Sequence, residues 1–380
     1  MKKVVHLIAV SSLITVVFAC NDTSSDGDPD AGLEDVLLAD TDADVDVDDE
    51  DTSDPLDDWP GQELDEEPLG LDWDMPPADD GLKFLIANVG NIDLFRCTSV
   101  AFNMCWTEQE EIVIDEIAAR DADVILLQEV TTAAQCQALE VDDLDDDHVC
   151  HPDYRPDEPE QVRRLVGPDY TIACDSTEGY ECVAARVGRV SIPGCDDGDL
   201  CRGLARTNEA VDGCDPGFTV SAVTIEYGDR TLDVVNVHPP SGREAAARQC
   251  RHDYFLNIFG EDAPLIEEDQ VLIGGDFNFD PYRGSQDDVD IALWNDFVST
   301  SFDDTRDDPL AFAYHSGLPE HDPPYHTSPL TQTTLDHVIS NSLQGRCTTL
   351  GAQPGEPPLD HFHGDEIERL DHLAIECILD

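Results

Sequence analysis

Several apolar runs in this 380-residue sequence stop abruptly at a carboxylate, an amide or an imidazole. The runs consist mainly of Val, Ile and Leu, and the polar residues that end them are Asn88, Glu129, His238, Asp276, Asn278, Asp336, Asp371 and His372. Polar groups at the carboxyl ends of buried strands tend to converge on one cleft, so we expect these side chains to share a site. Carboxylate and amide oxygens suit a hard cation such as Mg²⁺, and imidazoles suit proton transfer. A lone buried His or Asp is more often structural, so the prediction depends on the whole set.

The order of these elements resembles the endonuclease/exonuclease/phosphatase superfamily, which includes deoxyribonuclease I, abasic-site endonucleases, neutral sphingomyelinases and inositol polyphosphate 5-phosphatases. The resemblance covers about 82–380: an Asn at the end of the first strand, QE after the second, an N-x-H strand, GDFN, a late Asp-containing strand and a closing DH. It implies a four-layered α/β sandwich of two mixed, largely antiparallel sheets flanked by helices. It departs from the family at Leu370, where Ser or Thr is common.

The resemblance implies divalent-metal-dependent hydrolysis of a phosphate ester. This reaction must neutralise an anionic centre, align a water and protonate the departing alkoxide. By resemblance the metal residues are Asn88, Glu129 and Asp371, with Glu129 first, and the ion is Mg²⁺, with Mn²⁺ or Ca²⁺ as alternatives. Asp276 is similar to the residue that orients or deprotonates the water, and Asn278 to the one that donates its amide to a phosphoryl oxygen.

Two histidines share the remaining roles. His238 and His372 are jointly the candidates for general base, general acid and transition-state donor, and Asp336 resembles the carboxylate that hydrogen-bonds His372 and fixes its tautomer. With a histidine at position 238, the chain resembles deoxyribonuclease I, the sphingomyelinases and the inositol phosphatases more than the abasic-site endonucleases. Asn236 either joins the site or caps its strand.

Arginines supply candidate substrate contacts, because a guanidinium binds phosphate through two parallel hydrogen bonds. Arg243 and Arg248 lie in a helical stretch after His238, and Arg202 lies in a loop flanked by cysteines. The alternative is that these arginines balance neighbouring acidic residues.

Strand and helix patterns alternate along the part of the chain that carries these residues. We expect strands at 82–90, 121–130, 271–278, 334–341 and 373–379, a hairpin formed by 218–227 and 231–238, and helices near 108–119 and 243–259. Thr107 and Glu110 are spaced as a capping box for the first helix. The fold class is therefore α/β, with a mixed sheet covered by helices.

The N-terminal 80 residues carry no catalytic pattern. Residues 1–20 read as an export signal that ends at a lipobox-like Ala19-Cys20, so we expect lipidation of Cys20; a cleaved secretion signal and an uncleaved anchor are the alternatives. Residues 21–80 hold 25 acidic residues and no Lys or Arg, which predicts a disordered tether. Residues 81–380 form the catalytic domain. We expect a monomeric outer-membrane or cell-surface lipoprotein, or a secreted protein.

Cysteine usage supports export. Twelve of the thirteen cysteines remain when Cys20 is set aside, and an even number suits a disulfide-bonded exported domain. Short loops make Cys97–Cys105 and Cys195–Cys201 natural pairs. A zinc site is the rival interpretation, but the sequence contains no CxxC pair.

The formal net charge of −65 constrains the substrate, because nucleic-acid affinity normally comes from basic residues that neutralise phosphates. We expect a nuclease or related phosphodiesterase, for which high salt or divalent cations would lessen the repulsion. The alternatives are a sphingomyelinase-like enzyme or an inositol or sugar-phosphate phosphatase, and a surface binding module that has lost catalysis.

Overall fold

A computed structural model gives the fold of the chain. It describes residues 81–90, 103–139, 144–175, 181–207, 214, 219–241, 245–259, 265–278, 280, 312–315, 335–350, 370 and 372–380. The expected export signal, the lipobox residue Cys20 and the acidic tether lie outside these residues. So do two predicted site residues, Asp371 and Arg243.

The described strands form two seven-stranded sheets. The first sheet has the order β13 (Gly345–Thr349), β14 (Ile375–Leu379), β1 (Leu82–Asn88), β2 (Val124–Gln128), β4 (Cys182–Arg186), β3 (Tyr170–Cys174), β6 (Leu200–Arg202). The second has the order β11 (Phe312–His315), β12 (Asp336–Ser340), β10 (Val271–Asp276), β9 (Arg230–His238), β8 (Thr219–Tyr227), β5 (Val190–Ser191), and β7 (Arg206–Thr207) also pairs with β8. The pairs β1/β2, β3/β6 and β9/β10 are parallel and the others antiparallel, so both sheets are mixed, as expected.

The two sheets pack face to face. One apolar cluster contains inward side chains of both, with Phe84, Ile86 and Leu126 from the first sheet and Val234 and Leu272 from the second, all buried. Each such side chain contributes about 1.5–3 kcal/mol when fully buried. Gly274 lies where the sheets approach closely, because a Cβ there would collide with the Ile86 side chain.

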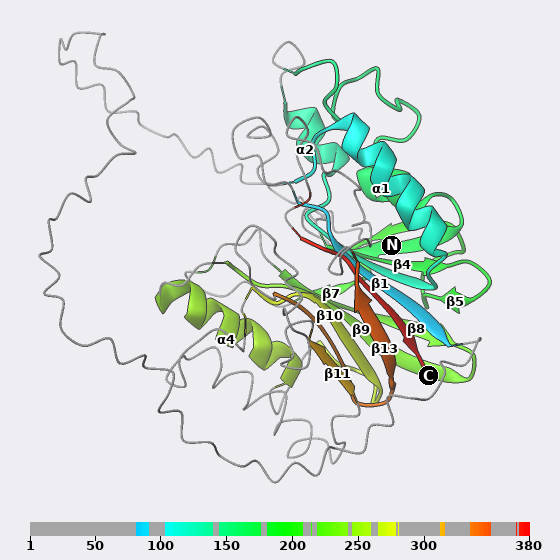
Figure 1. The fold of residues 1–380 in the computed structure, drawn as a ribbon, viewed down its shortest axis with the longest axis vertical. Helices are drawn as coiled ribbons and strands as arrows, with labels where there is room; N and C mark the ends of the chain where they lie inside the picture. Colours follow the sequence, from blue (N-terminus) through cyan, green and yellow to red (C-terminus); the bar gives the residue numbers. More distant parts are fainter. Residues whose placement is uncertain are drawn as a thin grey trace, which may run out of the picture. The chain divides into compact units, whose positions relative to one another are not determined.

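Helices cover the outer faces (Figure 1). Side chains of α1 (Thr107–Arg120) and α3 (Gln161–Val166) share a buried cluster with the first sheet, and α4 (Ala245–Phe259) does so with the second. The short α2 (Ala133–Ala138) follows β2. The resulting order of helix, sheet, sheet and helix confirms the four-layered α/β sandwich.

The first helix differs from its expected start. Trp106 is the N-cap residue of α1, and it makes no capping hydrogen bond through its side chain. The capping box proposed for Thr107 and Glu110 is wrong, because Thr107 is already helical and Glu110 turns inward to an ion pair with Arg164. Tertiary pairing of a buried carboxylate thus decided its orientation.

The covalent cross-links agree with the cysteine pattern. The described residues include the disulfides Cys136–Cys150, Cys174–Cys182, Cys195–Cys201, Cys214–Cys250 and Cys347–Cys377. The predicted Cys195–Cys201 pair is confirmed. Cys105 is also disulfide-bonded, and its expected partner, Cys97, lies outside the described residues. Among the described helices, none has the length and apolar character needed to cross a membrane.

Candidate active site

Four predicted site residues lie where parallel strands end together. Asn88 ends β1 and Glu129 directly follows β2, while His238 ends β9 and Asp276 ends β10. The parallel pairs β1/β2 and β9/β10 bring these carboxyl ends to one edge. There Asn88 donates to Glu129 within the first sheet and to Asp276 of the second sheet. The structure therefore brings these four residues together, as expected of strand ends that share an edge.

Asp336 and His372 reach the same edge in another way. Both were expected at the ends of strands, but Asp336 begins β12 and His372 precedes β14. Because β12 runs antiparallel to β10, the first residue of β12 pairs with the last of β10, which is Asp276. The expectation was wrong about direction, yet the residues belong to the cluster.

His372 lies between two carboxylates. Its Nδ1 donates to Asp336 Oδ2 at 2.7 Å, so the contact expected between them is present. Its Nε2 lies 3.5 Å from Asp276 Oδ2. A carboxylate that accepts from Nδ1 fixes the ring, so Nε2 is the nitrogen that faces the centre of the cluster.

His238 has the same arrangement with a partner that the sequence analysis missed. Its Nδ1 lies 3.0 Å from an oxygen of Glu181, which is fully buried, and its Nε2 lies 3.3 Å from Glu129 Oε1 and 4.0 Å from Asp276 Oδ2. Glu181 precedes β4, which runs antiparallel to β2, so it lies beside the end of β2. In the sequence Glu181 is a carboxylate that precedes an apolar strand, and the pattern used to predict site residues was a polar residue that ends an apolar run.

The electrostatics of the cluster follow from its burial. Burial alone would lower the pKa of His238, but hydrogen bonds and charges from Glu129 and Glu181 outweigh it and raise that pKa well above its usual value. Burial raises the pKa of Asp276 to about 6, although the neighbouring His372 and His238 act to lower it. Asp276 thus titrates close to neutral pH, in the range suited to proton transfer.

Glu129 fits a metal-binding carboxylate. Its backbone has φ of 59°, in the left-handed region, and its Oε2 is buried with no hydrogen-bond partner among the described residues. Gly90 leaves space for that oxygen, since a Cβ there would collide with it. A buried carboxylate oxygen without a partner is costly, and a cation would satisfy it.

The described residues contain no group of three or more His, Cys, Asp and Glu side chains arranged to hold a metal. This finding is compatible with Mg²⁺, which needs only one or two protein carboxylates and keeps several waters. The second predicted carboxylate ligand, Asp371, lies outside the described residues.

Asn88 and Asn278 are held by specific backbone contacts. The Gly90 N–H donates to Asn88 Oδ1 at 2.9 Å, so the Asn88 amide nitrogen faces Glu129 and Asp276 at 3.3 and 3.4 Å. In this geometry the Asn88 amide nitrogen donates to the two carboxylates, and its oxygen accepts one hydrogen bond from Gly90. Asn278, with φ of 54°, donates its N–H to Asp276 Oδ1 and its amide to the Pro239 carbonyl.

Asn236 lies beneath the site and joins the two sheets. Its amide nitrogen donates to the backbone carbonyls of Leu127 and Cys182, and its oxygen accepts from Gln128. Since all three of these hydrogen bonds are buried, Asn236 is a structural link between β9 and the first sheet.

The described arginines are not drawn into the cluster. Arg202 donates to Glu160 at 2.6 Å, which agrees with the charge-balancing alternative. Arg248 is half-buried on α4 and makes no hydrogen bond or ion pair with another described residue.

Comparisons with known proteins give structural neighbours only. No protein-family model and no curated protein matches the chain. TDP2 from D. rerio, complexed with single strand DNA product, is 13% identical with a TM-score of 0.47 over 80% of this chain and 100% of its own. Beta toxin from Staphylococcus aureus, with bound magnesium ions, is 11% identical with a TM-score of 0.47 over 78% and 99%. An endonuclease/exonuclease/phosphatase family protein from Bacteroides thetaiotaomicron is 13% identical with a TM-score of 0.45 over 80% and 95%.

Proposed function

We propose that this chain is a member of the endonuclease/exonuclease/phosphatase superfamily that hydrolyses a phosphate ester with a divalent metal ion. The observation that carries the proposal is a pair of buried histidines, each with Nδ1 on a carboxylate and Nε2 facing one cluster. The Nε2 of His372 lies 3.5 Å from Asp276, and that of His238 lies 3.3 Å from Glu129 and 4.0 Å from Asp276. Glu129, with its unpartnered buried oxygen, lies in the same cluster. A purely structural role does not explain six ionisable groups gathered at one edge of two sheets.

Each residue then has a chemical task. Glu129 would hold the cation, Mg²⁺ in the first instance, and a bound ion would supply charge neutralisation at the phosphate. Asp276 orients the attacking water and accepts its proton. His372 and His238 share the tasks of donating to the phosphoryl oxygens and protonating the leaving alkoxide, with Asp336 and Glu181 holding their rings. The side-chain amide of Asn278 has a second N–H besides the one on the Pro239 carbonyl, and this N–H would add a donor to the phosphate.

The substrate class is a phosphodiester, as in a nuclease or related phosphodiesterase. The net charge of −65 favours the second candidate, a small or lipid-borne phosphate, because a local pocket needs less positive charge than a nucleic-acid surface. The test offers duplex DNA, RNA, sphingomyelin and inositol phosphates in parallel, at low and high salt. Cutting of DNA or RNA supports the nuclease, and cleavage of the lipid or inositol phosphates alone supports the alternative. Hydrolysis of none of the four substrates would favour a non-catalytic binding module.

The same proposal places the enzyme outside the cytoplasm. Residues 1–20 are the export signal, Cys20 carries the lipid anchor, 21–80 is the tether and 81–380 is a monomeric catalytic domain. The disulfides within the described residues support this, because such bonds persist in oxidising compartments. Mass spectrometry of the mature chain would check the acyl group on Cys20, and an unmodified Met1 would contradict it.

A further inference from the structure

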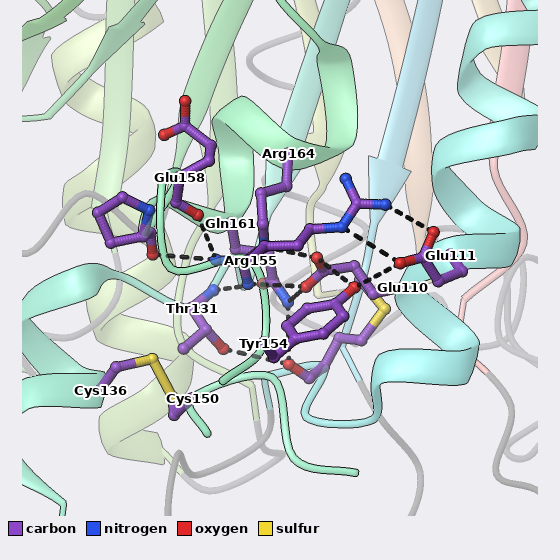
Figure 2. A network of polar contacts seen from close by, with 12 residues as sticks. Glu110, Glu111, Thr131, Cys136, Cys150, Tyr154, Arg155, Glu158, Gln161 and Arg164 are labelled. Atoms are coloured by element: carbon purple, nitrogen blue, oxygen red, sulfur yellow. Dashed lines mark hydrogen bonds and ion pairs between the residues drawn. A yellow bond between two sulfur atoms is a disulfide. The ribbon is translucent and has the colours of Figure 1, made fainter. Parts of the chain in front are cut away.

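A buried polar network lies outside the active site, between α1, α3 and the segment that follows β2 (Figure 2). Glu110 on α1 is fully buried and accepts from Arg164 on α3 at 2.6 and 2.9 Å. Tyr154 adds a third hydrogen bond to Glu110 at 3.1 Å. Apolar packing could replace such a buried ion pair with little loss of stability, so stability alone does not account for the pair.

Gln161 connects this network to the backbone. Its amide nitrogen donates to Glu110 Oε2 at 2.8 Å and to the Met104 carbonyl at 3.1 Å. Because the Glu110 carboxylate can only accept, it fixes which end of the amide faces it. Gln161 Oε1 is thereby turned to the Thr131 N–H, 2.6 Å away.

Thr131 belongs to the turn that carries Glu129. The backbone of Glu129 is in the left-handed region. This conformation costs a non-glycine residue roughly 1–2 kcal/mol and persists only where the surrounding structure enforces it. The turn is held by Gln161 at the Thr131 N–H, by the Thr131 hydroxyl on the Met104 carbonyl at 3.2 Å, and by Asn103 on the Val130 carbonyl at 3.1 Å. These three contacts begin one residue after Glu129.

We propose that Gln161, oriented by the Glu110–Arg164 pair, is a positioning residue for Glu129 and so sets the affinity of the metal site. This inference rests on the proposed function, since it requires a cation at Glu129. Gln161 does not touch the metal site. It holds the Thr131 N–H, and the backbone of the turn connects Thr131 to Glu129.

The test measures Mg²⁺ affinity apart from turnover. The melting temperature of the oxidised full chain is titrated with Mg²⁺ for the wild type, Gln161→Met and Arg163→Met, and the Mg²⁺ concentration for half-maximal hydrolysis is measured alongside. Met keeps the length of Gln161 and removes its hydrogen bonds. Arg163 is the matched control, because it is a buried residue of the same helix that donates to the carbonyls of Gly167, Tyr170 and Gly198, away from the Glu129 turn.

We expect Gln161→Met to weaken the apparent Mg²⁺ affinity by about tenfold, the scale of outer-shell changes at metal sites. Arg163→Met should lower the melting temperature without Mg²⁺ and leave the Mg²⁺ midpoint unchanged. Thr131→Val, which removes one hydroxyl from the turn, should shift the midpoint in the same direction by a smaller factor, and it decides the matter if Gln161→Met fails to fold.

The outcomes separate this inference from the proposed function. A wild-type chain that responds to Mg²⁺, with Gln161→Met and Thr131→Val matching its midpoint, would overturn the positioning role and leave the metal site in place. A wild-type chain with no response to Mg²⁺ in either measurement would overturn the metal site, and the positioning role with it.

Discussion

Two histidines with carboxylates on Nδ1 direct their Nε2 atoms into one cluster, His372 toward Asp276 and His238 toward Glu129, and the proposed chemistry at the residue scale rests on this arrangement. Each carboxylate fixes the orientation of one ring. Burial keeps water from competing for these contacts, so the directions in which Nε2 points are set before a substrate arrives. This organisation suits the proposed hydrolysis of a phosphate ester beside a cation at Glu129.

Glu129→Gln tests the metal-binding role at this scale. The substitution keeps the size of the side chain and removes the charge, so we expect the Mg²⁺ concentration for half-maximal activity to rise at least about tenfold. Activity is measured at a fixed substrate concentration over a range of Mg²⁺ concentrations. The control variant is Glu111→Gln, because Glu111 is an exposed carboxylate that pairs with Arg155. An unchanged Mg²⁺ midpoint in Glu129→Gln would remove Glu129 from the metal site.

The sequence predicted the site residues that end or follow strands, and the order of motifs added Asp336 and His372, but Glu181 and Gly90 were missed. Asn88, His238 and Asp276 follow a recognisable motif at strand ends. Glu181 precedes its strand and Gly90 contributes only an absence of Cβ, so neither carries a pattern that a single sequence makes visible. Their roles depend on which strands are neighbours.

At the element scale, antiparallel neighbours contribute their first residues to the site. Asp336 begins β12 and His372 precedes β14, so direction along the chain alone could not place them. The layers and the β8/β9 hairpin were predictable because period-2 strands and a short turn are local signals. The order of strands in each sheet depends on long-range pairing, which local patterns do not encode.

The Cys174–Cys182 disulfide gives a prediction about elements. It joins directly paired residues of β3 and β4 next to Glu181, whereas Cys347–Cys377 joins directly paired residues of β13 and β14. Replacing both cysteines of the first pair by Ala should lower turnover, because Glu181 loses a fixed neighbour. The same change in the second pair should mainly lower stability, by about 2–5 kcal/mol.

Thermal melts and steady-state rates of the two double variants check this prediction. The second loop is longer, with a separation of 30 residues against 8, so the loss of stability should be larger there. Equal losses of turnover in both variants would contradict a specific link between Cys174–Cys182 and Glu181.

His148 gives a pH prediction in the segment that pairs with the start of α1. Burial lowers its pKa and outweighs the opposing charges of Asp145 and Asp147, and its Nδ1 accepts from the Cys150 N–H. The unfolded chain therefore binds this proton more readily, so stability is present above the unfolded pKa of about 6.5 and is lost as the pH falls below it.

The variant His148→Asn isolates this contribution. Asn keeps an acceptor and does not titrate, so the difference in melting temperature between wild type and variant should be larger at pH 7.5 than at pH 5. Melting curves at both pH values measure it. A difference that grows as the pH falls would reverse the sign and contradict the buried neutral histidine.

At the scale of the whole molecule, the formal net charge of −65 makes electrostatic self-repulsion a large term that opposes folding. From residue 81 onward the chain still carries 60 acidic and 18 basic residues, so the negative charge is not confined to the acidic residues of 21–80 and self-repulsion acts on the folded part as well. Salt screens repulsion between exposed charges, and the melting temperature should rise between about 0.05 and 1 M NaCl. A melting temperature that falls over this range would show that the acidic surface does not oppose folding.

Hydrolysis of a simple phosphodiester, bis(p-nitrophenyl) phosphate, tests the central claim most directly. The rate is measured for wild type and His372→Ala in EDTA and after Mg²⁺ is restored, with the surface variant His252→Ala as control. We expect activity only with Mg²⁺, a loss of about 10²–10⁴-fold in His372→Ala with its melting temperature nearly unchanged, and wild-type activity in His252→Ala. Wild-type activity that survives EDTA, or near-normal turnover in His372→Ala, would contradict a metal-dependent phosphoesterase built on this site.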